Sequence, residues 1–204
     1  ITGEHLTEGD VLIGLPSAGV HSNGYSLVRK IVNHVGLAYT DEAPFEAEHP
    51  GRDLMRWTEG KATLGEVFLT PTRIYCDPVV DLLNAARGGE DFGIEDVHGI
   101  CHITGGGLSN LLRLHPSLGW DIHTPLPVLP EFKWLQSAGG VETREMYRTF
   151  NMGMGMVIAV DAARSDAVLR WLKARMPEAA VVGHVRDDGH RVVHAMKGVE
   201  FSHY

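Results

Sequence analysis

The hydrophobic positions of this chain form short runs that are separated by stretches of helical periodicity. Apolar, often β-branched runs predict strands over residues 11–15, 97–103, 120–124, 155–160, 179–185 and 191–196. Apolar residues at helical spacing predict helices over residues 24–35, 77–88, 108–114, 131–139, 143–150 and 162–176. Strands that alternate with helices are typical of an α/β or α+β layered domain.

Cap and turn residues mark the ends of several of these elements. Ser22 or Asn23, Asp77 and Asp161 are predicted to cap the helices that follow them. Asp188-Gly189, between the last two strands, predicts a hairpin. Because a hairpin is antiparallel, it favours a mixed sheet packed with helices over an all-parallel sheet.

Length and composition, with 44% hydrophobic and 22% charged residues, suit one large domain or a compact pair, and we expect a single domain over residues 1–204. Residues 38–60 are polar without a clear period, which predicts a surface excursion with room for a short helix. The chain begins with Ile1 rather than Met, so we expect it to be a C-terminal part of a longer protein.

Charge and cysteine content narrow the function classes. The formal net charge of -8 argues against nucleic-acid binding, so any anionic ligand has to be held by a local group of residues. No apolar run approaches the roughly 18 residues of a membrane span. The two cysteines, Cys76 and Cys101, are isolated in sequence, which predicts no disulfide framework and a cytoplasmic setting.

The first candidate for chemistry is the stretch GLPSAGVHSNGYSLVRK, residues 14–30, between a predicted strand and a predicted helix. A helix N-terminus offers unpaired N–H groups to an anion, and this one adds the polar side chains of Ser17, His21, Ser22 and Asn23. The alternative is that these residues only cap the helix and turn the chain. The pattern alone favours neither.

The second candidate is CHITGGGLSNLLR, residues 101–113. Gly105, Gly106 and Gly107 follow a strand and allow close approach of the backbone to a ligand. Thr104 adds a hydroxyl and Arg113 a positive charge. A flexible turn is the alternative, but three glycines cost backbone entropy, so we favour an anion-binding loop.

The third candidate is MYRTFNMGMGMVIAV, residues 146–160. Thr149 and Asn151 precede an apolar strand whose start is interrupted by Gly153 and Gly155. Glycines in a strand suggest a bulge or a ligand against the backbone. Methionines that fill a core and glycines that ease packing explain the pattern equally well.

The 12 histidines carry less weight. His98 and His102 have ligand-like spacing, but no carboxylate or cysteine nearby completes a metal-binding set with them, so we expect surface histidines and no protein-held metal. Glu142, Glu145 and Asp161 have the positions of charges at helix starts rather than of catalytic carboxylates.

Four stretches in this order, GLPSAGVHSNGYSLVRK, LTPTRIY, HITGGGL and YRTFNMGMGM, resemble the aminoimidazole ribonucleotide synthetase family, whose members are also called phosphoribosylformylglycinamidine cyclo-ligases. The resemblance runs from about Gly9 to Val185 and concerns the C-terminal half of that two-domain family. It implies ATP-dependent ring closure in purine biosynthesis: ATP activates the formyl amide oxygen of formylglycinamidine ribonucleotide, and a nitrogen closes the imidazole with release of ADP and phosphate.

The resemblance also implies site residues. The catalytic candidates are His21 and Asn23. The substrate-binding candidates are Ser17, Gly19, Ser22, Thr72, Arg73, Thr149, Asn151, Met152 and Gly153. The phosphate-binding candidates are Thr104, Gly105, Gly106, Gly107 and Arg113.

In this family the N-terminal half supplies most contacts to ATP and Mg²⁺ and builds a homodimer. The implied partners of this chain are therefore the ribonucleotide and its own N-terminal domain, and we expect the chain alone to fold without turning over. The alternatives are a related ATP-dependent enzyme of the selenophosphate synthetase or thiamine-monophosphate kinase type, a non-catalytic phosphate-ligand-binding domain, and an α/β domain whose glycine loops are only structural.

Overall fold

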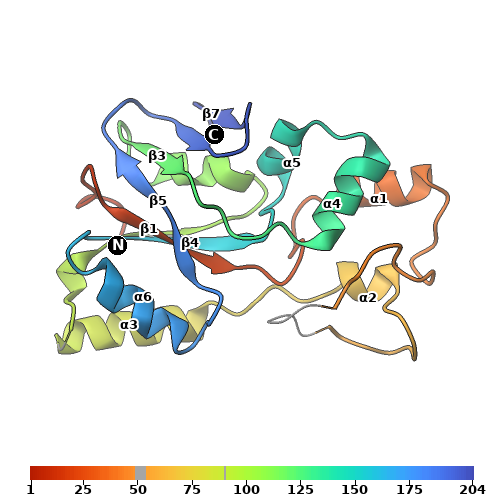
Figure 1. Ribbon diagram of the computed structural model, residues 1–204, viewed down its shortest axis with the longest axis horizontal. Coiled ribbons are helices and arrows are strands. Elements are labelled where there is room, and N and C mark those ends of the chain that lie inside the picture. Colours follow the sequence, from red (N-terminus) through yellow and green to blue (C-terminus); the bar gives the residue numbers. More distant parts are fainter. Residues whose placement is uncertain (49–53, 90) are drawn as a thin grey trace.

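A mixed sheet forms the centre of the molecule. In the computed structural model, which describes residues 1–48, 54–89 and 91–204, it has seven strands in the order β2-β4-β1-β5-β3-β6-β7 (Figure 1). The strands are β1 Val11–Pro16, β2 Val97–His102, β3 Gly119–Ile122, β4 Met154–Val160, β5 Ala180–Arg186, β6 Val192–His194 and β7 Glu200–Phe201. β3 and β6 are parallel and the other paired strands are antiparallel. The predicted mixed sheet packed with helices is confirmed.

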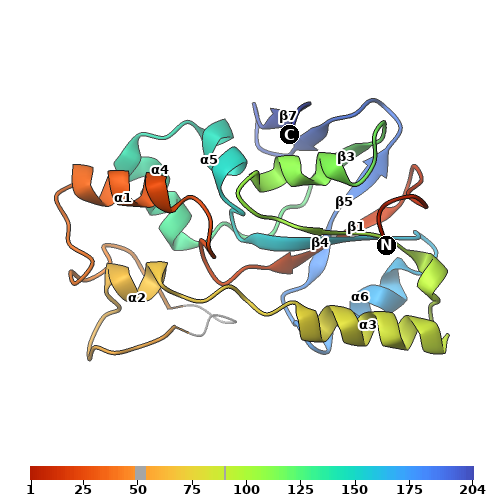
Figure 2. The same cartoon turned by 180° about the vertical axis from the view of Figure 1, so that it is seen from behind.

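Helices cover both faces of this sheet (Figures 1 and 2). The α-helices are α1 Tyr25–His34, α2 Leu64–Phe68, α3 Cys76–Gly88, α4 Pro130–Gly139, α5 Thr143–Thr149 and α6 Ser165–Lys173. The 3₁₀ segments are η1 Ile94–Asp96 and η2 Gly107–Arg113. α3 and α6 lie together on one face, and η2 and α5 lie on the other. α1 and α4 lie side by side beyond one end of the strands.

Side-chain alternation along β1 explains the two layers. Ile13 and Leu15 point into the core under α3 and α6, whereas Leu12 points into the core on the opposite face, and all three are fully buried. Successive side chains of a strand point to opposite faces. A central strand with helices on both sides is therefore apolar throughout, which is why VLIGL shows no polar alternation.

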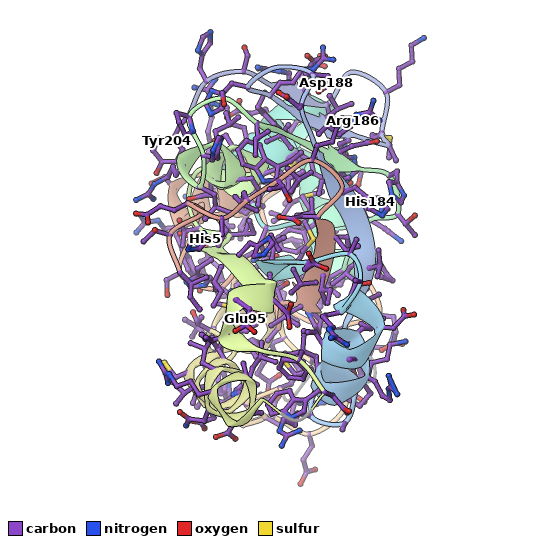
Figure 3. All side chains as sticks on the ribbon, turned by 90° about the vertical axis from the view of Figure 1, so that its left-hand side faces the viewer. His5, Glu95, His184, Arg186, Asp188 and Tyr204 are labelled. Atoms are coloured by element: carbon purple, nitrogen blue, oxygen red, sulfur yellow. The ribbon has the colours of Figure 1, made fainter. Side chains whose placement is uncertain are left out.

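The predicted hairpin at Asp188-Gly189 is wrong. β3 lies between β5 and β6, so these two strands do not pair with each other. The chain turns around the end of β3, where the Trp120 N–H donates to the Arg191 carbonyl at 2.8 Å. Arg186 and Asp188, labelled in Figure 3 at this end of the molecule, form an ion pair with 3.4 Å between Nε and Oδ2.

The predicted helix caps are also wrong. α1 starts after Gly24, whose φ of 72° and contact with the ring of Phe150 leave no room for a Cβ, and no side chain caps this end. α3 begins at Cys76, so Asp77 lies inside its first turn. Asp161 accepts from the Ala163 N–H in a turn ahead of α6, which begins only at Ser165.

The predicted surface excursion over residues 38–60 is only partly covered, because residues 49–53 lie outside the described residues. Residues 38–48 and 54–60 contain no helix, and the short helix of this region, α2, begins later, at Leu64.

Both cysteines are free thiols, Cys76 exposed and Cys101 buried. Among the described residues, no helix combines the length and the apolar composition that crossing a membrane requires.

Candidate ligand-binding site

The sheet topology brings the three sequence motifs to one place. The first motif leaves the end of β1, the glycine motif leaves the end of β2, and the third motif enters the start of β4. β4 lies between β1 and β2 and is antiparallel to both, with Pro16 opposite Met154 and His102 opposite Met156. The start of β4 therefore meets the ends of its two neighbours.

Asn151 joins the first and third motifs. Its Oδ1 accepts from the Ser17 hydroxyl at 2.7 Å and from the Gly153 N–H at 2.9 Å, and its Nδ2 donates to the Gly19 carbonyl at 2.8 Å. The Ser17 N–H also donates to the Gly153 carbonyl at 2.9 Å. Ser17 and Asn151 are each 1% exposed. Their side chains brace the loops, and their predicted role as substrate contacts stays a prediction.

Two non-glycine residues adopt a positive φ within the described residues, and both lie in these loops: His21 at 55° and Met152 at 52°. Side chains at such φ values cost of order 1 kcal/mol or more, and they persist where the surroundings hold them. Strain of this kind is concentrated at ligand sites. Both positions belong to the predicted set, and the strain was not visible in the sequence.

His21 is held in a compact group of aromatic side chains. The Ala18 N–H donates to His21 Nε2 at 3.0 Å. The Tyr75 ring lies 6.1 Å and the His102 ring 6.5 Å from the imidazole, measured between centroids. Burial, helped by His102 and Arg73, lowers the pKa of His21 to about 4. His21 is therefore neutral at pH 7.

Tyr75 and Gly155 fix the floor under His21. The Tyr75 hydroxyl donates to the Pro16 carbonyl at 2.7 Å. A Cβ added at Gly155 would lie 1.9 Å from that hydroxyl and 3.0 Å from Cε1 of His21. The glycine in β4 is therefore needed for close packing against this group.

The glycine loop is stabilised by Asn110 and packs on α5. Asn110 accepts from the Thr104 hydroxyl at 3.0 Å and donates to the Gly107 carbonyl at 2.7 Å. Gly107 has a φ of 54°, and a Cβ there would lie 2.0 Å from the Tyr147 carbonyl oxygen. A Cβ at Gly105 would lie 3.5 Å from Asn23 Oδ1, so this loop and the first motif are neighbours.

The members of this site differ in their access to solvent. Ser22 and Gly105 are exposed, and Asn23 and Thr104 are half-buried. Gly19, Met152, Gly153 and Gly107 are buried. Thr149 is half-buried at the end of α5, where its hydroxyl donates to Glu145 at 3.1 Å. The solvent-facing groups available to a ligand are therefore concentrated at Ser22, Asn23, Thr104 and Gly105.

Arg113 lies at the far end of η2 from the glycines. Its guanidinium is 5.2 Å from the centroid of the Tyr204 ring, and Tyr204, labelled in Figure 3, also packs next to Gly106. The tyrosine thus lies between the glycine loop and the arginine, whose predicted phosphate contact stays a prediction.

A cleft of about 530 Å³ adjoins the first motif at Ala18. It contains Thr72 and Arg73, both predicted from the sequence. Its lining is Ala18, Met55, Pro71, Thr72, Arg73, Ile74, Asp77, Pro78, Asp81, Arg175 and Met176. The volume is in the range of small-molecule sites, and the lining combines apolar side chains with charges of both signs.

The expectation of surface histidines is wrong for His21, His98 and His194, which are all buried. His98 Nδ1 lies 2.6 Å from Asp10 Oδ2, and Asp161 completes a group whose possible ligand atoms lie within 4.8 Å of one another. Both carboxylates were missed because they are remote from His98 in sequence. This group is at the start of β1, the end opposite to His21.

Sequence reasoning missed three further residues of the site: Tyr75, His102 and Asn110. Tyr75 and His102 lie within LTPTRIY and HITGGGL, so the motifs were found, but no pattern indicated that their rings surround His21. Asn110 follows the glycines in sequence, and the turn of η2 places its side chain next to the Thr104 hydroxyl. The sequence alone does not indicate this contact.

Comparisons with known proteins agree with the resemblance seen in the sequence. The family model described as "AIR synthase related protein, C-terminal domain" matches residues 7–195. Phosphoribosylformylglycinamidine cyclo-ligases of Methanosarcina barkeri and Methanosarcina mazei are each 40% identical to the chain, and each match covers 94% of the chain and 49% of the relative. The chain thus spans about half the length of these relatives.

Solved structures of the hydrogenase maturation protein HypE share the fold. HypE in complex with ATP is 18% identical with a TM-score of 0.56, and the match covers 98% of this chain and 51% of that one. Escherichia coli HypE is 19% identical with a TM-score of 0.54, over 96% and 49% of the two chains. The family match and the 40% identity decide the assignment: the chain belongs to the family of AIR synthase related proteins and carries their C-terminal domain.

Proposed function

We propose that this chain is the ribonucleotide-binding, C-terminal half of a phosphoribosylformylglycinamidine cyclo-ligase, which uses ATP to convert formylglycinamidine ribonucleotide to aminoimidazole ribonucleotide in purine biosynthesis. The observation that carries the proposal is the convergence of three polar motifs at one edge of the sheet, braced by Asn151 and strained at His21 and Met152. The 40% identity to cyclo-ligases over 94% of the chain supports it.

Within this proposal the residues divide by access. The exposed backbone at Gly105 offers a neutral N–H donor to the 5'-phosphate. The Thr104 hydroxyl beside it donates to Asn110 and so holds this loop in shape. Asn23 lies next to this loop, and His21 accepts a hydrogen bond from Ala18, which lines the cleft. In this proposal both residues contact the reacting part of the ribonucleotide. Arg73 lines the cleft and supplies a local positive charge. An anionic ligand needs this local charge, because the net charge of the chain is -8.

The proposal assigns ATP and Mg²⁺ mainly to the N-terminal half that the relatives' length implies. Mg²⁺ prefers carboxylate, phosphate and water oxygens, whereas the candidate loops of this chain offer imidazole, hydroxyl and amide groups. Bound Mg²⁺ would neutralise phosphate charge on ATP. This chain would bind and orient the ribonucleotide and exclude water from it. The protein would be cytoplasmic, would form a homodimer through its N-terminal half, and would bind neither nucleic acid nor membrane.

An apolar rim next to the cleft supports a domain partner. Met55 and Ile74 both line the cleft and are 55% and 70% exposed. Large exposed apolar side chains that gather in one region mark interaction surfaces. The N-terminal half is the partner that would cover them.

The rival functions have less support. The HypE structures share the fold at under 25% identity, so they do not favour kinase or synthetase chemistry of another kind. A non-catalytic ligand-binding domain and purely structural glycine loops are separated from the proposal by experiment.

Calorimetric titration of the purified chain with formylglycinamidine ribonucleotide tests the proposal. We expect saturable binding that His21→Ala weakens about tenfold, the equivalent of one lost hydrogen bond of about 1.4 kcal/mol. His5→Ala is the matched control, because His5 is exposed and lies outside the candidate loops (Figure 3). Absence of binding by the wild-type chain, or equal binding by both variants, would count against the assignment.

Turnover is tested with the N-terminal half of the Methanosarcina mazei relative added in trans. The chain alone should release no ADP in the presence of ATP and the ribonucleotide, and the mixture should release ADP only when the ribonucleotide is present. Release of ADP by the chain alone would contradict the assignment of ATP to the other half.

A further inference from the structure

The hydrogen bond between Ala18 and His21 fixes the protonation of the imidazole. A backbone N–H can only donate, so Nε2 of His21, 3.0 Å from the Ala18 nitrogen, has to be the acceptor and carries no proton. A neutral imidazole holds one proton in total. In His21 this proton is therefore on Nδ1, and burial keeps the ring neutral by lowering its pKa to about 4.

The Nδ1–H of His21 is a buried donor without an acceptor. The residue is 2% exposed, and Nδ1 has no hydrogen-bond partner among the residues that the structure describes. A buried unsatisfied donor costs about 1–3 kcal/mol, so native structures rarely keep one without a reason. Trp120 Nε1 is also unsatisfied, but it lies in the sheet, away from the motifs.

The backbone and the neighbouring rings hold this donor in place. His21 adopts its φ of 55° in a loop that Asn151 ties to β4. The titratable groups that face its ring are Tyr75, His102 and Arg73. None of them carries a negative charge at pH 7, so nothing in this group favours an imidazolium.

We propose that His21 is a neutral hydrogen-bond donor, which gives its Nδ1 proton to an oxygen atom of the bound ribonucleotide and acts neither as a general base nor as a cation. The proposal rests on the proposed function for the identity of the ligand. The ligand atom that accepts this proton is an oxygen of the carbonyl, amide or phosphoryl type. A gain of negative charge on that oxygen strengthens its hydrogen bond with His21.

Nitrogen NMR of the ¹⁵N-histidine-labelled chain at pH 7 tests the tautomer without any ligand. We expect His21 Nδ1 to resonate as a protonated nitrogen and Nε2 as an unprotonated one, and the assignment is made by comparison with His21→Asn. The opposite tautomer, or an imidazolium, would overturn the proposal whatever the chain binds.

Calorimetry with formylglycinamidine ribonucleotide tests the donor role. Asparagine carries its amide near the position of Nδ1 and tolerates a positive φ, whereas glutamine carries its amide near the position of Nε2. We expect His21→Asn to stay within about threefold of wild-type affinity, and His21→Gln and His21→Ala to lose about tenfold or more. Urea unfolding of all variants verifies that each is folded.

The two proposals fail in different ways. Wild-type affinity that all three variants retain would overturn the donor role and leave the chain a ribonucleotide-binding domain. If the wild-type chain does not bind the ribonucleotide but NMR shows the Nδ1-protonated tautomer, the proposed ligand is overturned. The buried, unpaired Nδ1–H donor of His21 would remain established.

Discussion

The hydroxyl of Ser17 donates to the side-chain oxygen of Asn151 at 2.7 Å, across 134 positions of sequence. Both residues are buried, and the same asparagine holds the Gly19 carbonyl and the Gly153 N–H. The bond therefore connects the end of β1 to the start of β4 in the middle of the candidate site. Loss of this hydrogen bond should lower the free energy of unfolding more than it lowers the affinity for a ligand.

Asn151→Ala should destabilise the fold by about 3 kcal/mol, because it leaves three buried polar groups without a partner. Urea unfolding measures the change. Asn84→Ala is the control, since Asn84 is exposed on α3 and its loss should cost no more than about 0.5 kcal/mol. Equal stability of the two variants would show that Asn151 does not brace the loops.

Two adjacent glycines should respond differently to alanine. Gly107→Ala should cost at least about 2 kcal/mol, because its φ of 54° is strained for alanine and the Cβ meets the Tyr147 backbone oxygen. Gly106→Ala should cost about 1 kcal/mol or less, because the Cβ meets side chains, among them the exposed Tyr204. Thermal unfolding ranks the two, and a reversed order would contradict the described conformation of the loop.

The packing of Tyr75 on Gly155 can be tested by a double-mutant cycle. Gly155→Ala should be strongly destabilising, because its Cβ would lie 1.9 Å from the Tyr75 hydroxyl. In a Tyr75→Phe background this cost should fall by about 1 kcal/mol or more. Gly88→Ala, at the end of α3, is the control: its Cβ meets no described residue within 4 Å, so the change should be neutral or slightly stabilising. Strict additivity of the two changes would contradict the contact.

Stability should fall as the pH is lowered from 6.5 towards 4. Burial lowers the pKa of both His21 and His194 to about 4, whereas an unfolded histidine has a pKa of about 6.5. In this window the unfolded chain binds protons that the folded chain does not, so the stabilisation is fully present above pH 6.5 and is lost on acidification.

Urea unfolding at pH 7.5, 6 and 5 measures this slope, and His194→Asn should reduce it. The asparagine oxygen can still accept from the Met196 N–H, which His194 Nδ1 accepts at 3.0 Å. His5→Asn, at an exposed position, should leave the slope unchanged. A slope that is the same in all three proteins would exclude His194 as a source of the pH dependence.

The sequence predicts the local elements well and their partners poorly. Periodicity located β1, β4 and α6 to within a few residues, because apolar spacing is a property of neighbouring positions. It could not show that β3 separates β5 from β6, since a strand's pattern reports which face is buried and not which strand lies beside it.

The same limit applies to the site. The motifs containing His21, Gly105 and Asn151 were found, because small and polar residues between a strand and a helix are locally unusual. The strain at His21, the phenol of Tyr75 above Gly155 and the pairing of His98 with Asp10 depend on contacts between distant segments. Helix caps failed for a related reason: the cap position of α1 is Gly24, which packs against the ring of Phe150 from a distant segment.

The position of β1 in the sheet also has a consequence for biosynthesis. Within this domain it is the first strand to be synthesised, yet its two neighbours, β4 and β5, end only at Val160 and Arg186. The apolar segment VLIGL therefore has no strand partner until most of this domain has been synthesised. Late pairing of this kind slows folding and leaves apolar surface exposed, so the yield of soluble protein should depend on chaperones that bind this segment during synthesis.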